Sequence, residues 1–133
     1  MSVKVGWSRD SGILVATVIG RIDNANSSEC EEMLRSGIGD GEQSLVLNLS
    51  QLSYVSSAGL RILLLMAREF TGPDQAFGLC ALSSGVSDVI HVSGFSGIMS
   101  VYDSQAEAVE VIAASGAPPS AAALDDALAE IDS

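Results

Sequence analysis

The stretch Leu45-Val-Leu-Asn-Leu-Ser-Gln-Leu-Ser-Tyr-Val-Ser-Ser-Ala-Gly-Leu-Arg-Ile-Leu-Leu-Leu65 joins two apolar segments that differ in period. The first segment, residues 44–49, is short and rich in branched apolar side chains, which is typical of an inner β-strand. After Ser56 the apolar residues recur at helical spacing, at Leu60, Leu63, Leu64, Ala67 and Phe70. This stretch therefore predicts a buried strand that leads through a short turn into a helix.

Two serines, Ser56 and Ser57, stand where the predicted helix begins. The first turn of a helix has free backbone N–H groups and the positive end of the helix dipole, so this position favours anions. A phosphoryl group on Ser57 would add a charge of about −1.5 to −2 and three acceptor oxygens, which a helix N-terminus can accommodate. A second interpretation needs no modification, because Ser56 can cap the helix with Ser57 in its first turn.

The residues before this stretch predict a hairpin and a helix. Residues 3–7 and 12–20 read as two strands, separated by the turn residues Arg9-Asp-Ser-Gly12. The segment Asn26-Ser-Ser-Glu29 has the form of a capping box and predicts a helix over residues 27–36. We expect Gly37 to close the last turn of this helix in the left-handed conformation.

The residues after the stretch predict two further strands and two further helices. Residues 76–82 form a short apolar strand, and a helix follows until Gly94. Residues 98–102 predict a weak edge strand, and Asp103 or Ser104 can cap a last helix that ends near residue 114. Strands that alternate with helices after an opening hairpin predict an α/β fold, with a mixed sheet of four to five strands and about four helices.

A linker follows this domain. Residues 1–114 are expected to form the domain, since Gly116, Pro118 and Pro119 prevent the last helix from continuing. Residues 115–133 form a Pro/Ala-rich acidic tail that is either flexible or a short extra helix. In such a helix Leu124, Leu128 and Ile131 would share one face.

Composition limits the classes of function. A length of 133 residues fits one domain and leaves no room for a second. Six Lys and Arg against 17 Asp and Glu give a net charge of −11, which disfavours nucleic acid as a partner. The longest apolar run, residues 62–67, is far shorter than the roughly 20 residues that span a bilayer, and the start has no signal-peptide core. We therefore expect a cytoplasmic protein without membrane insertion.

The chain has few side chains for catalysis or for metal binding. Cys30 and Cys80 lack CxxC spacing and His91 is the single histidine, so no metal site and no cofactor are expected. A serine hydrolase would need a base near its nucleophile, and the sequence has no G-x-S-x-G elbow. It also has no P-loop and no G-x-G-x-x-G motif. The sequence therefore does not indicate an enzyme, and we assign no catalytic residues.

The central stretch resembles the signature of the STAS domain, specifically that of the bacterial anti-sigma factor antagonists. In that family a strand leads through a turn such as S-S-A-G-L, here Ser56-Ser-Ala-Gly-Leu60, into a helix. Gly20-Arg-Ile-Asp23 is similar to the family's G-x-[LI]-D segment, and the order of the predicted elements agrees to about residue 114. Two positions depart from the commonest pattern: Ser56 stands where many antagonists have Asp, and Ala58 where they have Ser or Thr.

This resemblance implies a partner-switching regulator. The unphosphorylated antagonist would bind an anti-sigma factor that is also a serine kinase of the histidine-kinase-like ATPase type. Phosphorylation of Ser57, or alternatively of Ser56, would release it, and a metal-dependent serine phosphatase would restore it. The expected partner-binding residues are Asp23, Ser56, Ser57, Ala58, Gly59, Leu60 and Arg61.

Two interpretations stay open at this stage. A STAS domain can also act as a constitutive interaction subunit of a signalling or transporter complex, without a phosphorylation switch. For single residues, Arg61 can pair with a phosphate or be a solvated helix residue. Asp23 can face a partner or cap the turn of residues 24–26.

Overall fold

The structure is a computed structural model that describes residues 3–115 and 118–132. The chain opens with an antiparallel hairpin of β1 (Val3–Asp10) and β2 (Ile13–Ile22). Ser11 and Gly12 form its turn with φ values of 53° and 82°, so both residues are left-handed. Two consecutive left-handed residues match the twist of the strands that such a turn joins.

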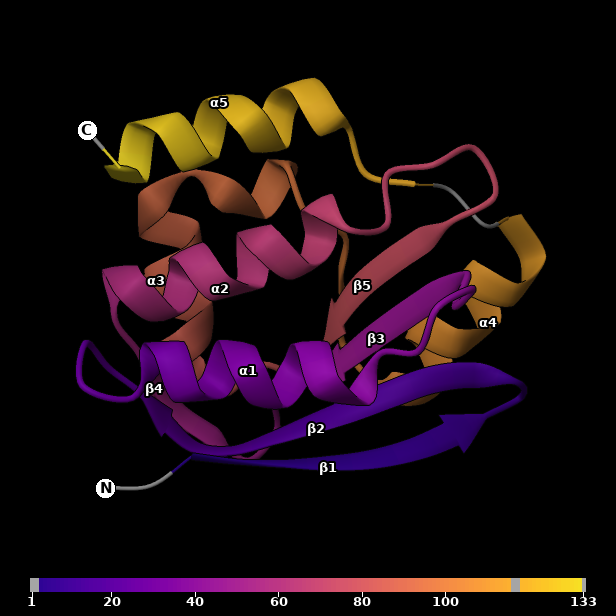
Figure 1. The fold of residues 1–133 in the computed structure, drawn as a ribbon, viewed down its shortest axis with the longest axis horizontal. Helices are drawn as coiled ribbons and strands as arrows, with labels where there is room; N and C mark the ends of the chain where they lie inside the picture. The colour runs from indigo at the N-terminus through magenta and orange to yellow at the C-terminus, as the bar shows by residue number, and fades with distance from the viewer. Residues whose placement is uncertain (1–2, 116–117, 133) are drawn as a thin grey trace.

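The remaining strands extend this hairpin into one six-stranded mixed sheet (Figure 1). The strands follow the order β1-β2-β3-β5-β6, and every pairing after the hairpin is parallel. A short additional strand, β4, pairs with the last residues of β2. The bounds are β3 (Ser44–Asn48), β4 (Leu52–Val55), β5 (Ala76–Cys80) and β6 (Val101–Tyr102).

Helices cover both faces of the sheet. Helices α1 and α2 pack on one face together with α3, and α4 packs on the other (Figure 1). The α-helices are α1 (Ser27–Gly37), α2 (Ser57–Arg68), α3 (Ser84–Ser93), α4 (Gln105–Ser115) and α5 (Ala121–Asp132), and a 3₁₀ turn spans Phe95–Gly97.

The apolar run of β2 reflects burial on both faces. Leu14, Ala16 and Val18 belong to the core beneath α1 and α2. Ile13 and Val15 belong to a smaller core under α4. A strand that is covered on both sides reads as a continuous apolar run rather than an alternating one. The predicted α/β class with a mixed sheet is confirmed.

Three details of the strands differ from the prediction. The strand β4 was not expected, because only Leu52 and Val55 at its ends are buried and this spacing shows no strand period. The strand over residues 76–82 ends two residues early, at Cys80, since Ala81 takes a left-handed φ of 56°. The last strand is reduced to the two residues of β6.

Two of the predicted helix signals are wrong for α1. Asn26 occupies the N-cap position, but its side chain makes no capping hydrogen bond. It accepts from the backbone N–H of Asp23 at 2.9 Å and donates to the carbonyl of Arg21 at 2.9 Å. Gly37 is not left-handed. A Cβ there would overlap the ring of Trp7, so a glycine is needed for close packing.

The tail forms a helix, which is one of the two alternatives left open by the sequence. Ser120 accepts a hydrogen bond from the backbone N–H of Ala123 at 3.2 Å and so caps α5. Leu124 and Ala127 are buried against the main core, which α5 reaches by packing on α2. In the described part of the chain, no helix is long and apolar enough to cross a membrane.

Candidate functional site

Ser56 fixes the start of α2. Its hydroxyl accepts a hydrogen bond from the backbone N–H of Gly59 at 3.2 Å, which satisfies one of the free donors of the first turn. Its own backbone N–H donates to the carbonyl of Ile22 at 2.9 Å. The predicted N-cap is therefore confirmed, and it ties the beginning of α2 to the end of β2.

Ser57 is the first residue of α2 and is exposed. Among the described residues, its hydroxyl has no hydrogen-bond partner. The two hydroxyls therefore differ in their availability for modification. The hydroxyl of Ser56 caps α2, whereas the hydroxyl of Ser57 faces solvent. The half-buried Ala58 follows.

Gly59 is buried where α2 crosses the strands. A Cβ at this position would lie 2.6 Å from Cγ2 of Val55 and 2.9 Å from Cβ of Ile22. The close approach that a glycine permits is thus made inside the molecule, against β2 and β4, and not at the outer surface. Leu60 is also largely buried, with 4% of its surface exposed.

Asp23 organises the turn between β2 and α1. Its Oδ1 accepts hydrogen bonds from the backbone N–H groups of Ala25 at 2.9 Å and Asn26 at 3.1 Å. Its Oδ2 lies 3.5 Å from Nε of Arg21, whose guanidinium stacks 4.9 Å above the ring of Tyr54. The carboxylate is therefore part of the turn, beside the backbone link between Ile22 and Ser56.

An apolar hollow opens next to Ser57, between α2 and α3. It has a volume of about 370 Å³. Its lining consists of Ser57, Leu60, Asp88, Val89, Val92 and Ser93. Val92 is 89% exposed, which is exceptional for a large apolar side chain in this chain. Together with Leu60 and Val89, it makes the lining of this hollow mostly apolar.

The fold and the sequence match one protein family. A family model described as the STAS domain matches residues 8–108. The chain belongs to the STAS domain family. BtrV of Bordetella bronchiseptica, whose name assigns it provisionally to the anti-sigma factor antagonists, is 35% identical over 103 residues. That alignment covers 77% of this chain and 89% of BtrV.

Solved structures of anti-sigma factor antagonists share the fold of this STAS domain. A crystal structure from Mycobacterium paratuberculosis has a TM-score of 0.76 at 24% identity, covering 84% of this chain and 94% of that one. Unphosphorylated SpoIIAA has a TM-score of 0.68 at 18% identity, covering 84% and 97%. The phosphorylated form of Bacillus SpoIIAA has a TM-score of 0.60 at 19% identity, covering 82% and 99%.

Sequence reasoning missed the α3 side of the site in this STAS domain. Val86 and Ile90 are buried at i and i+4 of α3, so Val92 cannot face the same core. Because Val86, Ile90 and Val92 cannot all face one core, the sequence of α3 could have indicated an exposed valine. The structure brings the expected partner-binding residues together only in part. Ser57 and Leu60 line the hollow, whereas Gly59 and Asp23 stabilise the local packing and the turn.

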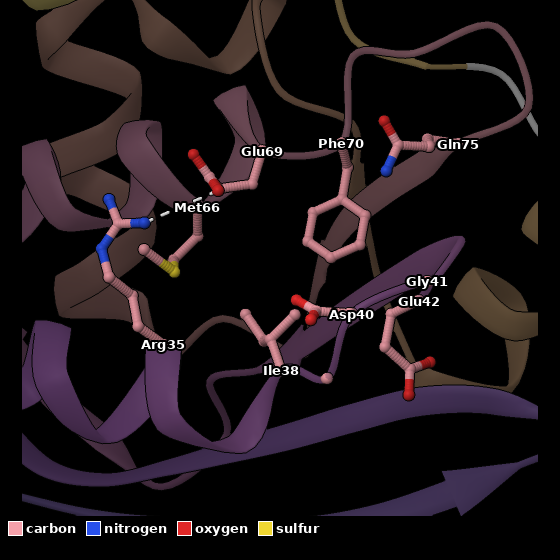
Figure 2. Close-up of a pocket in the computed structure, with 10 residues that line it drawn as sticks. Arg35, Ile38, Asp40, Gly41, Glu42, Met66, Glu69, Phe70 and Gln75 are labelled. Carbon is pink, nitrogen blue, oxygen red and sulfur yellow. Dashed lines mark ion pairs between the residues drawn. The ribbon is translucent and has the colours of Figure 1, made fainter.

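A second hollow lies at the other end of α2 (Figure 2). Its volume is about 240 Å³, and Ile38, Met66 and Phe70 supply its apolar part. Arg35 from α1 reaches across to Glu69 at 3.6 Å. None of the predicted site residues of the STAS domain lines this second hollow.

Among the described residues, the cysteines and the histidine lie away from the hollow beside Ser57. Cys30 and Cys80 are buried, and burial raises the pKa of each thiol to about 11. His91 is exposed on α3 but does not line the hollow. Within residues 3–115 and 118–132, no three His, Cys, Asp or Glu side chains are grouped as metal ligands.

Proposed function

We propose that this STAS domain is an anti-sigma factor antagonist that works by partner switching. In its unphosphorylated form it binds a cognate anti-sigma factor that is also a serine kinase of the histidine-kinase-like ATPase type. Phosphorylation of Ser57 releases it, and a metal-dependent serine phosphatase returns it to the binding form. We place this cycle in the cytoplasm.

The observation that carries this proposal is the position of Ser57, exposed at the start of α2 and on the rim of an apolar hollow. A partner that buries the hollow also buries the hydroxyl of Ser57. One residue can then both contribute to the interface and control it.

The structure favours Ser57 over Ser56 as the phosphoacceptor. Ser56 is half-buried and its hydroxyl caps α2. Phosphorylation of Ser56 would therefore remove the cap. Ser57 leaves the cap intact. A phosphate on Ser57 would lie at the positive end of the α2 dipole, which stabilises negative charge. The modified chain is therefore expected to stay folded.

Phosphorylation would act mainly on the interface and leave the sheet and its core intact. The phosphate would bring a charge of about −1.5 to −2 to the edge of the apolar hollow. The hollow already contains the carboxylate of Asp88, and the chain carries a net charge of −11. A partner suited to this surface presents an apolar side chain for Leu60, Val89 and Val92, with basic groups around it. Burying a phosphate against this apolar contact would remove its hydration, which makes the free energy of binding less favourable.

The test uses the anti-sigma factor that is captured with the unmodified chain from its native cells. Incubation of this complex with ATP should add one phosphate, and peptide mass spectrometry should map it to Ser57. Ser57→Ala should abolish the modification, whereas Ser56→Ala should retain it at reduced stability.

Two results would contradict the proposal. One is a chain that carries no phosphate under any growth condition. The other is binding that is indifferent to Ser57→Glu. Together they would leave the constitutive STAS interaction subunit as the remaining interpretation.

A further inference from the structure

The C-terminal helix α5 lies outside the part of the chain that the STAS family model matches, which ends at residue 108. It packs on α2 through Leu124 and Ala127, which are 0% and 2% exposed. An ion pair of 2.8 Å joins Asp125 to Arg68 near the end of α2. The helix α5 therefore packs on the element that carries Ser57.

The residues of α2 on the face that α5 contacts form one stripe along the helix, and this stripe begins at Ser57. Ser57, Arg61, Leu64 and Arg68 are spaced i, i+4, i+7 and i+11, so they follow one face of the helix. The ion pair of Arg68 shows that α5 reaches this face. Figure 1 shows α5 running antiparallel to α2, towards the end at which α2 begins.

The register of the two helices places the last turn of α5 near Arg61. Arg61 precedes Arg68 by seven positions, and α5 continues for seven positions beyond Asp125. Both segments span about 10 Å at the helical rise of roughly 1.5 Å per residue. The last turn of α5 is therefore level with Arg61, about one helical turn short of Ser57.

Arg61 thus stands between two sources of negative charge. The C-terminal end of α5 carries the negative pole of its dipole and the acidic residue Glu130. Ser57 is four residues before Arg61, a spacing at which a phosphate and a guanidinium on one helix can pair. A phosphate on Ser57 would therefore compete with the end of α5 for the same cation.

We propose that α5 is a strap whose docking on α2 is weakened when Ser57 is phosphorylated, with Arg61 as the cation that both groups share. The proposal rests on the proposed function only in taking Ser57 as the modified residue. In the unmodified chain the docked strap covers the stripe beyond Ser57 and leaves the hollow between α2 and α3 to a partner. In the phosphorylated chain the acidic helix undocks more often, and its charge then adds to the repulsion of the partner.

Hydrogen exchange of the full chain tests this coupling without the kinase. Phosphoserine is installed at position 57 during synthesis, and exchange of the α5 amides is followed by mass spectrometry. We expect these amides to exchange roughly threefold faster than in the unmodified chain, the size of one weakened surface ion pair and helix-end contact. The amides of α4 serve as an internal reference and should not change.

Matched variants separate the coupling from a general effect of charge. Phosphoserine at Ser28, which is exposed on α1, should leave α5 unchanged. Arg61→Gln should remove most of the difference between the two forms at Ser57. Leu124→Ser gives the exchange rate of an undocked α5. Equal α5 exchange with and without the phosphate at 57, or an equal increase in α4, would overturn the proposal. Neither result depends on whether a kinase modifies Ser57 in cells.

Discussion

The substitution Gly59→Ala tests the packing that places Ser57. Two effects oppose each other at this position. Alanine is favoured over glycine inside a helix by about 1 kcal/mol. The added Cβ, however, would lie 2.6 Å from Cγ2 of Val55 and 2.9 Å from both Cβ and Cγ2 of Ile22.

The unfavourable contact should dominate. Ile22 and Val55 are β-branched and at most 1% exposed, so their side chains have little room to change rotamer. The Cβ of Ile22 can move only with the backbone of β2. Overpacking of this kind costs typically about 1–3 kcal/mol, and contact with two stiff neighbours favours the upper part of that range. We expect a net loss of about 1–2 kcal/mol after the gain in helix propensity.

Urea denaturation followed by Trp7 fluorescence and circular dichroism measures this loss. The matched control is Gly6→Ala in β1, where an added Cβ meets no atom within 4 Å. That variant should be as stable as wild type or slightly more stable. A Gly59→Ala variant that equals or exceeds the stability of wild type would show that α2 does not approach β2 and β4 as closely as described.

Three further experiments test the cap at Ser56, the docking of Leu124 and the burial of the two cysteines. Ser56→Ala should lower the free energy of unfolding by about 1 kcal/mol through loss of the cap, whereas Ser57→Ala should change it by less than about 0.5 kcal/mol. Urea denaturation compares the two variants, and equal effects would contradict the assignment of the cap. Leu124→Ala, at a fully buried site, should lower the free energy of unfolding by about 2–3 kcal/mol and raise the hydrogen exchange rate of the α5 amides at least tenfold. Unchanged hydrogen exchange would contradict the docking of α5. The free energy of unfolding should fall as the pH rises from about 9 to about 11, because the unfolded chain releases the thiol protons of Cys30 and Cys80 before the folded chain does. Replacing both cysteines with alanine should reduce that pH dependence, and an unaltered dependence would contradict their burial.

The parts of the fold that follow from local rules were predictable from the sequence. The strand before Ser56 and the helix after it show different periods, and the cap by Ser56 needs only residues three positions apart. Gly94 ends α3 in the left-handed conformation, with a φ of 81°. In each case the residues that decide the structure are neighbours in the chain.

The parts that depend on distant residues were not predictable in the same way. Gly37 looks like a helix stop, yet the residue that requires it is Trp7 on another element. The hollow beside Ser57 exists because α3 packs next to α2, so Val92 becomes part of the site only through the tertiary fold. The docking of α5 is of the same kind, since a helix of 12 residues is marginal alone and gains its order from α2.

In the proposed function, the charge on Ser57 controls binding to the anti-sigma factor. Its most direct test is the affinity of the captured anti-sigma factor for the full chain with serine and with phosphoserine at position 57, measured by calorimetry at one salt concentration. Placing a phosphate against the apolar hollow should weaken binding at least about 30-fold, the size of an unpaired charge in an interface. Equal affinities for the two forms would show that the charge on Ser57 does not control binding.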